Sequence, residues 1–444
     1  MKISVVGTGY VGLVSGVCLA EKGHDVVCID IDQVKVDRIN RGEPPIYEAG
    51  LETLLKKNIG TNLRADTDLL KAVRETDCSL IAVGTPFKGD AIDLTYVRQV
   101  SDDIGKAIAS KDNYHVVVVK STVVPGTTDG VVLPALEQAS GKQAGVDFGV
   151  GMNPEFLREG VAVTDFMEPD RIVLGGIDER TLDVMAEIYR VFAGVDVVRT
   201  NPRTAEMIKY TSNSLLATMI SFANEIGNLS AAIGGVDVTE VMQGVHMDKR
   251  LSPITEHGRV TPSFTTYIES GCGFGGSCFP KDVKALIAHG KQQGLPMSLL
   301  DSVIRVNADQ PEQMITLLKK HYPVLKAVKV AVLGLAFKPG TDDIRESPAI
   351  PVIRRLLDEG AVVSAFDPIA EAEMKHEFTD SDVRYTGTVD AAIEGVDAIL
   401  LITRWSEFEE LPSKLSALDN PPLLVDGRRM LDKTSVPRYE GIGL

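Results

Sequence analysis

The chain has 444 residues, of which 44% are hydrophobic and 24% charged, values typical of a globular protein with roughly two or three domains. Its net charge of −16 argues against nonspecific binding to nucleic acid or to an anionic membrane surface, although a single site can still attract an anionic ligand. The five cysteines form no Cys-x-x-Cys pair and have no histidine cluster beside them. We therefore expect a cytoplasmic protein without a metal site, a disulfide framework or a membrane span.

The first thirty residues carry a pattern typical of dinucleotide-binding proteins. Residues 2–6 predict a strand, Gly7-Thr-Gly-Tyr-Val-Gly12 a turn, the residues to about 22 a helix, and a second strand ends at Asp30. Such glycines allow a tight turn, close approach of the backbone to a pyrophosphate, and helix–strand packing. A carboxylate at position 30 can bind a ribose hydroxyl and repels a 2′-phosphate. We therefore expect NAD to bind here, and the glycines argue against a signal peptide.

Further strands are predicted at 78–83, 115–119 and 148–151, and polar residues follow each of them. Ligands of open parallel sheets gather beyond the carboxyl ends of the strands. Four residues at these ends are therefore candidates for a site, although each alone could equally be a capping or turn residue: Thr85, Thr122, Glu155 and Glu159.

A long helix is predicted from about residue 203 to 234, and it is apolar on several sides. Helices of this kind are usually buried between domains or subunits. Lys209 and Asn213 are four residues apart and share one face. A buried lysine needs a partner or a function. The alternative is a lysine that extends to solvent.

The stretch Gly273-Phe-Gly-Gly-Ser-Cys-Phe-Pro-Lys-Asp282 places one thiol among glycines, directly before a predicted helix. Pro280 suits the first helical turn, and the unpaired amides at a helix start favour a thiolate. We expect this to lower the pKa of Cys278, whereas the carboxylate of Asp282 would raise it. The other interpretation is a buried, inert cysteine in a glycine-rich turn.

The remaining residues predict a polar, irregular segment at 248–273, a helix at 301–320 and a second, smaller doubly wound unit. Its strands are expected at 329–335, 362–367, 398–402 and 423–426. No full Gly-x-Gly-x-x-Gly occurs there, so we expect no second NAD. Its loops offer basic residues to a phosphate-bearing ligand: Lys338, Arg345, Arg428 and Arg429.

These blocks together resemble the UDP-glucose/GDP-mannose dehydrogenase family over nearly the whole chain. The most specific are Gly273 to Asp282 and the run Phe337-Lys-Pro-Gly-Thr-Asp-Asp-Ile-Arg-Glu-Ser347. The resemblance implies an α/β fold of two Rossmann-like doubly wound domains joined by a long central helix and a helical dimerisation region. The expected divisions are an NAD-binding domain at 1–198, a central domain at 199–312 and a nucleotide-sugar domain at 313–444. A homodimer or higher homo-oligomer is also implied.

The implied reaction is a four-electron oxidation of the C6 alcohol of a nucleotide sugar to a carboxylate, with two NAD reduced in turn. An aldehyde cannot lose a second hydride until a nucleophile has added to its carbon, which explains the need for a thiol. The adduct on Cys278 would be a thiohemiacetal, then a thioester that water cleaves. The resemblance implies an oxyanion role for Lys209 and Asn213, positioning of a water by Asp282 and Thr122, and acid–base catalysis by Glu155.

The resemblance also implies binding residues. Those expected to contact the cofactor are Gly7, Gly9, Tyr10, Val11, Gly12, Asp30, Lys35, Thr85, Thr122, Glu159, Lys281 and Arg345. Those expected to contact the nucleotide sugar are Phe156, Leu157, Arg158, Glu159, Lys209, Asn213, Arg250, Tyr267, Gly273, Phe274, Gly275, Phe337, Lys338 and Arg428, with Arg250 reaching the site of a partner subunit.

One segment departs from the family pattern, because residues 251–270 are longer and less basic than the family's usual UDP-glucose-binding segment. UDP-glucose is the first expectation for the substrate, and GDP-mannose or a UDP-N-acetylhexosamine is the alternative. A two-electron dehydrogenase of the 6-phosphogluconate or 3-hydroxyacid type would need neither the thiol nor the last domain. A non-catalytic nucleotide-sugar-binding protein is the third possibility.

Overall fold

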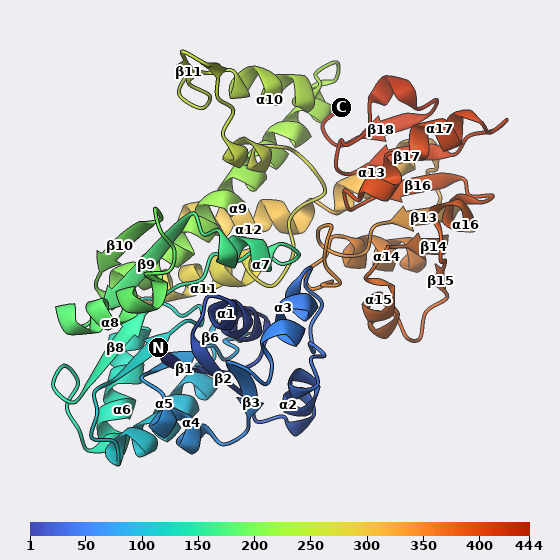
Figure 1. Ribbon diagram of the computed structural model, residues 1–444. Helices are drawn as coiled ribbons and strands as arrows, with labels where there is room; N and C mark the ends of the chain where they lie inside the picture. The colour runs from blue at the N-terminus through green and yellow to red at the C-terminus, as the bar shows by residue number, and fades with distance from the viewer. The chain divides into compact units, whose positions relative to one another are not determined.

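An eight-stranded sheet forms the centre of Met1–Ser212, the first of two units into which the computed structural model of residues 1–444 divides (Figure 1). The strand order is β10-β9-β8-β7-β4-β1-β2-β3, and all neighbours are parallel except β8 and β9. The strands are β1 (Lys2–Val6), β2 (Asp25–Ile29), β3 (Leu63–Asp66), β4 (Cys78–Ile81), β7 (His115–Val119), β8 (Phe148–Met152), β9 (Arg171–Gly176) and β10 (Asp196–Thr200).

The central strands of this sheet are apolar on both faces because helices cover both. Val5 belongs to the hydrophobic cluster on one face, whereas its neighbour Val6 belongs to the cluster on the other. The connecting elements are α1 (Tyr10–Glu21), α2 (Gln33–Asn40), α3 (Leu51–Asn58), α4 (Leu69–Glu75), the hairpin β5 (Phe87–Lys88) and β6 (Ala91–Ile92), α5 (Thr95–Ala109), the π-helix η1 (Thr128–Val132), α6 (Leu133–Ser140), α7 (Ala162–Met167) and α8 (Glu179–Tyr189).

The predicted long helix is α9 (Pro202–Ile233), and the boundary between the units falls within it. The second unit, Asn213–Leu444, continues with a helical region that contains one small hairpin. Its elements are α10 (Val238–His246), β11 (Ile254–Thr255), β12 (Gly258–Arg259), η2 (Ser263–Tyr267), α11 (Phe279–Gln292), α12 (Ser298–Asp309) and α13 (Glu312–His321).

A six-stranded parallel sheet of order β15-β14-β13-β16-β17-β18 forms the rest of the second unit. The strands are β13 (Lys329–Leu333), β14 (Val362–Phe366), β15 (Arg384–Tyr385), β16 (Ala398–Leu401), β17 (Leu423–Asp426) and β18 (Tyr439–Gly441). Between them lie α14 (Ala349–Asp358), α15 (Glu371–Glu377), α16 (Val389–Ile393), η3 (Ser406–Phe408), α17 (Leu411–Ser416) and η4 (Lys433–Ser435). The predicted α/β class, with parallel sheets and a long helix, is confirmed.

The second sheet repeats the start of the first, but its acidic residue is used differently. Asp367 follows β14 as Asp30 follows β2. Its Oδ2 accepts hydrogen bonds from Leu335 N at 2.7 Å, Ala336 N at 3.0 Å and Trp405 Nε1 at 3.0 Å, and its Oδ1 accepts from the amides of residues 369 and 370. The side chain is buried, and internal donors therefore occupy both oxygens.

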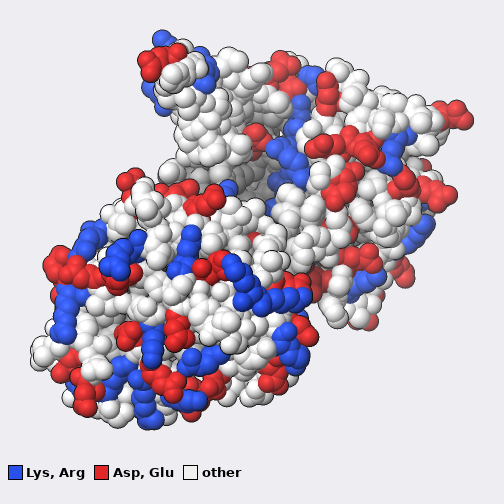
Figure 2. Space-filling model, viewed as in Figure 1, with Lys and Arg blue, Asp and Glu red and all other residues white.

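None of the helices combines the length and the apolar character that a membrane crossing requires. Acidic and basic side chains are interspersed over the visible face of the first unit (Figure 2).

Candidate active site

The glycine-rich turn before α1 has the shape that a dinucleotide requires. Gly7 has φ +99°, and a Cβ on Gly12 would lie 1.9 Å from the carbonyl oxygen of Gly7. Gly9 is the N-cap of α1, no side chain caps this helix, and a Cβ on Gly9 would meet open space. The first-turn amides are therefore accessible to a phosphate, as the sequence predicts. The second predicted feature of this site is the acid at the end of β2.

Asp30 is held in place by its own loop. Its Oδ2 accepts from Thr8 N at 2.9 Å and Thr8 Oγ1 at 2.5 Å, and its Oδ1 accepts from Asp32 N at 3.0 Å. Burial tends to raise the pKa of Asp30, but these hydrogen bonds and the charge of Lys35 outweigh it and keep the pKa below its usual value. The carboxylate is therefore ionised and fits a ribose hydroxyl. The glycines and Asp30 together fit NAD, which would supply a hydride acceptor there.

Thr85 and Thr122, predicted from two neighbouring strands, meet beyond the carboxyl ends of β4 and β7. Thr85 Oγ1 donates to the carbonyl oxygen of Thr122 at 2.8 Å. This contact joins two of the expected cofactor residues.

Glu155 and Lys209 form a buried ion pair. Lys209 Nζ lies 2.9 Å from Glu155 Oε1, and the two side chains are only 4% and 5% exposed. Lys209 therefore does not extend to solvent. Burial tends to raise the pKa of Glu155, but Lys209, the amide of Leu157 and the charge of Lys120 lower it. The structure thus holds an ionised carboxylate beside an ammonium group, a pair suited to moving a proton or stabilising an oxyanion.

A buried cluster beside this pair was not predicted. Lys120 Nζ donates to Asn153 Oδ1 at 2.9 Å, Tyr189 donates to the same oxygen, and Asn153 Nδ2 donates to Val173 O at 2.9 Å. Burial lowers the pKa of Lys120 to about 8. The cluster fixes the first residue of the segment that carries Glu155. The signal in the sequence that could have revealed this cluster is Lys120, which directly precedes Ser121 and Thr122.

Cys278 is the most accessible of the five thiols, since the other four are buried. It is the N-cap residue of α11, Pro280 lies in the first turn, and Asp282 N donates to the Cys278 carbonyl at 2.8 Å. Burial raises the pKa of the thiols of Cys18 and Cys28 to about 12, which makes them unreactive. The predicted thiol at a helix start is therefore present, and the fully buried alternative is wrong.

Asn213 and Asp282 also meet, as two of the predicted catalytic residues. Asn213 Nδ2 donates to Asp282 Oδ2 at 2.6 Å, and Lys281 Nζ donates to Oδ1 at 2.7 Å. Asp282 is buried, so each carboxylate oxygen has a polar partner. On α9, Lys209 and Asn213 are one turn apart.

The segment from Gly273 to Asp282, which carries Cys278 and is here called the thiol segment, packs directly against the segment from Phe337 to Ser347 within the second unit. Gly276 N donates to Arg345 O at 2.7 Å, and a Cβ on Gly276 would lie 2.6 Å from the ring of Phe337. A Cβ on Gly275 would lie 2.3 Å from the carbonyl oxygen of Glu346. The absence of side chains at these two glycines is therefore what allows the segments to touch.

Arg428 and an aromatic group complete this region. Arg428 Nη1 donates to Gly273 O at 3.0 Å, which ties the segment after β17 to the thiol segment. Phe279 packs with Tyr267 at 6.2 Å and with Phe274 at 6.0 Å between ring centroids. Several predicted nucleotide-sugar residues therefore lie around the start of α11.

Other predicted residues make contacts elsewhere. Arg250 is exposed and pairs with Asp248, and Arg429 donates to both oxygens of Asp237 at 2.9 and 2.8 Å. Arg158 pairs with Asp165 at 2.6 Å, Arg345 pairs with Asp343 at 2.7 Å, and Lys338 Nζ lies 5.6 Å from the ring centroid of Phe337. Val11 lies in α1, whereas Leu157 and Glu159 lie between β8 and α7. Arg429, offered by the sequence to a phosphate, is thus engaged internally.

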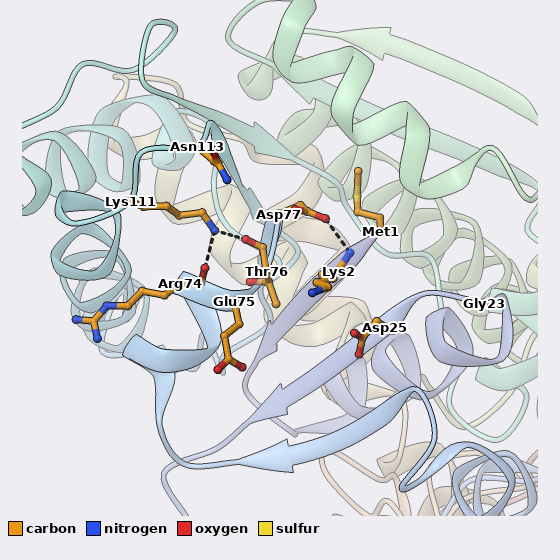
Figure 3. A pocket seen from close by; sticks show the side chains of 10 residues that line it. All are labelled: Met1, Lys2, Gly23, Asp25, Arg74, Glu75, Thr76, Asp77, Lys111 and Asn113. Carbon is orange, nitrogen blue, oxygen red and sulfur yellow. Dashed lines mark hydrogen bonds between the residues drawn. The ribbon is translucent and has the colours of Figure 1, made fainter.

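A surface pocket of about 510 Å³ lies at the amino ends of β1, β2 and β4, opposite the carboxyl ends at which the cofactor residues gather (Figure 3). In it, Lys2 N donates to Asp77 Oδ2 at 2.9 Å, and Lys111 Nζ donates to carbonyls at the end of α4. The ammonium group of Lys111 therefore has its hydrogen-bond acceptors within the protein. The pocket contains none of the predicted site residues.

Comparison with known proteins gives matches over most of the chain. Three models of the UDP-glucose/GDP-mannose dehydrogenase family match: the NAD binding domain at residues 1–193, the central domain at 203–309 and the UDP binding domain at 331–433. A UDP-glucose 6-dehydrogenase of Haloferax volcanii is 42% identical, with 100% of both chains covered. A GDP-mannose 6-dehydrogenase of Pseudomonas savastanoi pv. phaseolicola is 41% identical, with 97% of this chain and 95% of the relative covered.

A solved UDP-glucose dehydrogenase from the hyperthermophilic archaeon Pyrobaculum islandicum superimposes with a TM-score of 0.90, at 40% identity and with 100% of this chain and 97% of that chain covered. Because the family models account for most of the sequence and relatives match it from end to end, this chain belongs to the UDP-glucose/GDP-mannose dehydrogenase family, and NAD is the cofactor of its oxidoreductase chemistry.

Proposed function

We propose that this protein is a UDP-glucose 6-dehydrogenase that oxidises the C6 alcohol to a carboxylate through a covalent adduct on Cys278. The observation that carries this proposal is the partly exposed thiol at the start of α11, in a chain that belongs to this family. NAD held at the Gly7–Gly12 turn and Asp30 would supply the hydride acceptor for each of the two oxidations.

The chemistry assigned to the thiol is balanced in three steps. The alcohol loses a proton and a hydride and becomes an aldehyde. The thiolate of Cys278 adds to the aldehyde carbon, and the alkoxide so formed takes up a proton to give a thiohemiacetal. The thiohemiacetal then loses that proton and a second hydride to become a thioester. Water then cleaves the carbon–sulfur bond, which releases the carboxylate and returns the thiol.

The roles proposed for the surrounding groups follow from their charges. Lys209 and Asn213, one turn apart on α9, would donate to the oxyanion at the tetrahedral stages. Glu155 would take and return the proton in the thioester steps, which requires the ionised state that Lys209 favours. Asp282 and Thr122 would position the water. Phe337, Lys338 and Arg428 would contact the nucleotide sugar.

GDP-mannose is the second candidate substrate, supported by the 41% identical GDP-mannose 6-dehydrogenase. Residues 251–270 are the segment most suited to decide between them, because this segment differs from the family pattern and Tyr267 packs against Phe279, next to the thiol. A UDP-N-acetylhexosamine is the third candidate.

A homodimer built along α9 is part of this proposal. Leu215, Phe222 and Leu229 are exposed, and their spacing of seven residues places them on one face of the helix. Figure 2 shows few charged side chains over α10 and the adjoining end of α9. We also propose that the chain divides into three domains, at residues 1–198, 199–312 and 313–444.

The experiment that tests the proposal measures NADH formed per sugar consumed, with UDP-glucose, GDP-mannose, UDP-N-acetylglucosamine and UDP-N-acetylmannosamine. We expect two NADH per sugar, an acid as the product, and the highest kcat/KM for UDP-glucose. One NADH per sugar and no acid would instead identify a two-electron dehydrogenase. Higher kcat/KM for GDP-mannose would identify that substrate, and no NADH with any sugar would favour a binding protein.

A further inference from the structure

Glu48 is a buried carboxylate that lies outside all the motifs of the sequence, in the loop between α2 and α3. Its Oε2 accepts from the hydroxyl of Tyr10 and from Gly160 N at 2.7 Å, and its Oε1 accepts from Ala162 N at 2.8 Å. These partners come from two segments far apart in the sequence. One carboxylate therefore joins the first residue of α1 to the start of α7.

The two segments that Glu48 joins are both predicted to act in the reaction. Tyr10 directly follows Gly9, the N-cap of the dinucleotide-binding helix. Gly160 directly follows Glu159 and ends the segment that carries Glu155, and its φ of +85° marks a sharp change of chain direction. The same amide lies 3.1 Å from the Tyr10 hydroxyl, so the three groups form one closed cluster.

The segment 153–160 is thereby fixed at both ends. Its first residue, Asn153, is bound by Lys120 and Tyr189, and its last, Gly160, by Glu48. A buried acceptor with three donors defines the position of each donor, because leaving a buried amide without an acceptor costs stability. The Glu48 end differs from the other in that it includes the cofactor-binding helix.

We propose that Glu48 is a positioning residue that holds the Glu155–Glu159 segment in register with the dinucleotide-binding helix α1. Glu48 acts through Tyr10, Gly160 and Ala162 and touches neither substrate nor cofactor. The inference rests on the proposed function, in which Glu155 carries protons and α1 binds NAD.

The test replaces Glu48 with Gln, which keeps the shape but puts an N–H donor where one of the present donors needs an acceptor. Glu21→Gln is the matched control. Glu21 lies on α1 of the same unit and likewise accepts two side-chain hydrogen bonds, from Lys57 at 2.5 Å and Asn58 at 2.9 Å, but both of these partners lie outside the 153–160 segment. Four quantities are measured: kcat, KM, the Kd for NADH by fluorescence, and amide hydrogen exchange of residues 153–165 without ligands.

For Glu48→Gln we expect about a tenfold loss of kcat, less than a threefold change in KM for the nucleotide sugar, about threefold weaker NADH binding and about tenfold faster exchange at Gly160 and Ala162. Glu21→Gln should leave all four unchanged. Wild-type kcat and exchange in Glu48→Gln would overturn the inference, and so would equal effects in Glu21→Gln.

Tyr10→Phe provides a second test that keeps both amide contacts and does not depend on the folding of Glu48→Gln. We expect about threefold faster exchange at Gly160 in the ligand-free protein, whereas a tyrosine that only contacts the cofactor would leave this rate unchanged, and that result would overturn the proposed coupling. Exchange requires no substrate. Should the wild type oxidise no nucleotide sugar, the proposed function fails while the exchange rates still decide the role of Glu48.

Discussion

Cys278 differs from the other cysteines at the scale of single atoms, because it alone combines partial exposure with a helix start. We expect Cys278→Ser to lower acid formation by about three orders of magnitude, roughly 4 kcal/mol of transition-state free energy, since a serine alkoxide is scarce near neutral pH. NADH yield per sugar should fall from two to at most one. Product analysis by mass spectrometry, alongside NADH absorbance, measures both.

Cys272→Ser is the control for this prediction. Cys272 directly precedes the segment that carries Cys278 but is fully buried, with its Sγ 3.5 Å from the carbonyl oxygen of Ile402. We expect it to keep an NADH yield of two. Full acid formation by Cys278→Ser would contradict the covalent mechanism.

The charge of Lys120 should influence how kcat depends on pH. Its positive charge, with that of Lys209, favours the ionised form of Glu155. In Lys120→Met this support is lost, the pKa of Glu155 rises, and a larger fraction of Glu155 is protonated at any given acidic pH. We expect the acidic limb of the kcat profile to move to higher pH, with about a tenfold lower kcat below the limb.

Lys111→Met is the matched control, since Lys111 is a partly buried lysine of the same unit whose Nζ donates to Val73 O at 2.8 Å at the other edge of the sheet. Its pH profile should coincide with that of the wild type. An unshifted limb in Lys120→Met would show that Lys120 does not influence the group that titrates.

At the scale of elements, the contact between the thiol segment and the 337–347 segment depends on Gly276. A Cβ there would lie 2.6 Å from the Phe337 ring, at a φ of +85°. We expect Gly276→Ala to destabilise the protein by about 2 kcal/mol or more and to raise KM for the nucleotide sugar at least about fivefold. Urea unfolding and steady-state kinetics measure the two effects.

Gly294→Ala is the control that separates the backbone strain of a positive φ from the steric clash with Phe337. Gly294 has a similar φ of +79°, but its Cβ would meet open space. We expect a loss of only about 1 kcal/mol and an unchanged KM. A raised KM in both variants would show that the contact with Phe337 is not what matters.

At the scale of the whole molecule, the exposed face of α9 predicts the assembly. We expect Phe222→Lys to place a charge in the dimer contact and to halve the mass measured by light scattering during size-exclusion chromatography. Leu299→Lys, at an exposed position on α12, should leave the mass unchanged. A wild-type protein that already elutes as a monomer would contradict the proposed dimer.

The strands that are buried on both faces could be predicted from the sequence most accurately. The bounds of β1, β7 and β17 agree with the apolar runs of the sequence, and α9 agrees within one residue at each end. Five strands of the two large sheets were missed, namely β3, β9, β10, β15 and β18, and so were the two small hairpins. In β10, four of five residues are exposed, and β15 has only two residues, so neither carries a continuous apolar signal. The antiparallel pairing of β9 with β8 likewise has no local signature.

The sequence identifies many of the candidate site residues but not which of them contact one another. The sequence singles out Glu155 and Lys209 separately, yet their ion pair joins residues 54 positions apart and depends on how β8 and α9 pack. Glu48 has no motif of its own and follows Pro44-Pro-Ile-Tyr47 in a loop. Only three-dimensional structure brings such a carboxylate to its donors.

Asp367, whose oxygens are both occupied by internal donors, has a consequence for the order of events in turnover. Asp367 is buried and accepts five internal hydrogen bonds, whereas Asp30 is only partly buried and accepts three, so Asp30 marks the one nicotinamide site that we propose for each chain. In the proposed four-electron oxidation, removal of two hydrides from one sugar would then require an exchange of coenzyme between the two oxidations. The reduced coenzyme would leave and an oxidised one would bind while the half-oxidised sugar stays bound, so retention of that sugar would decide how much aldehyde escapes.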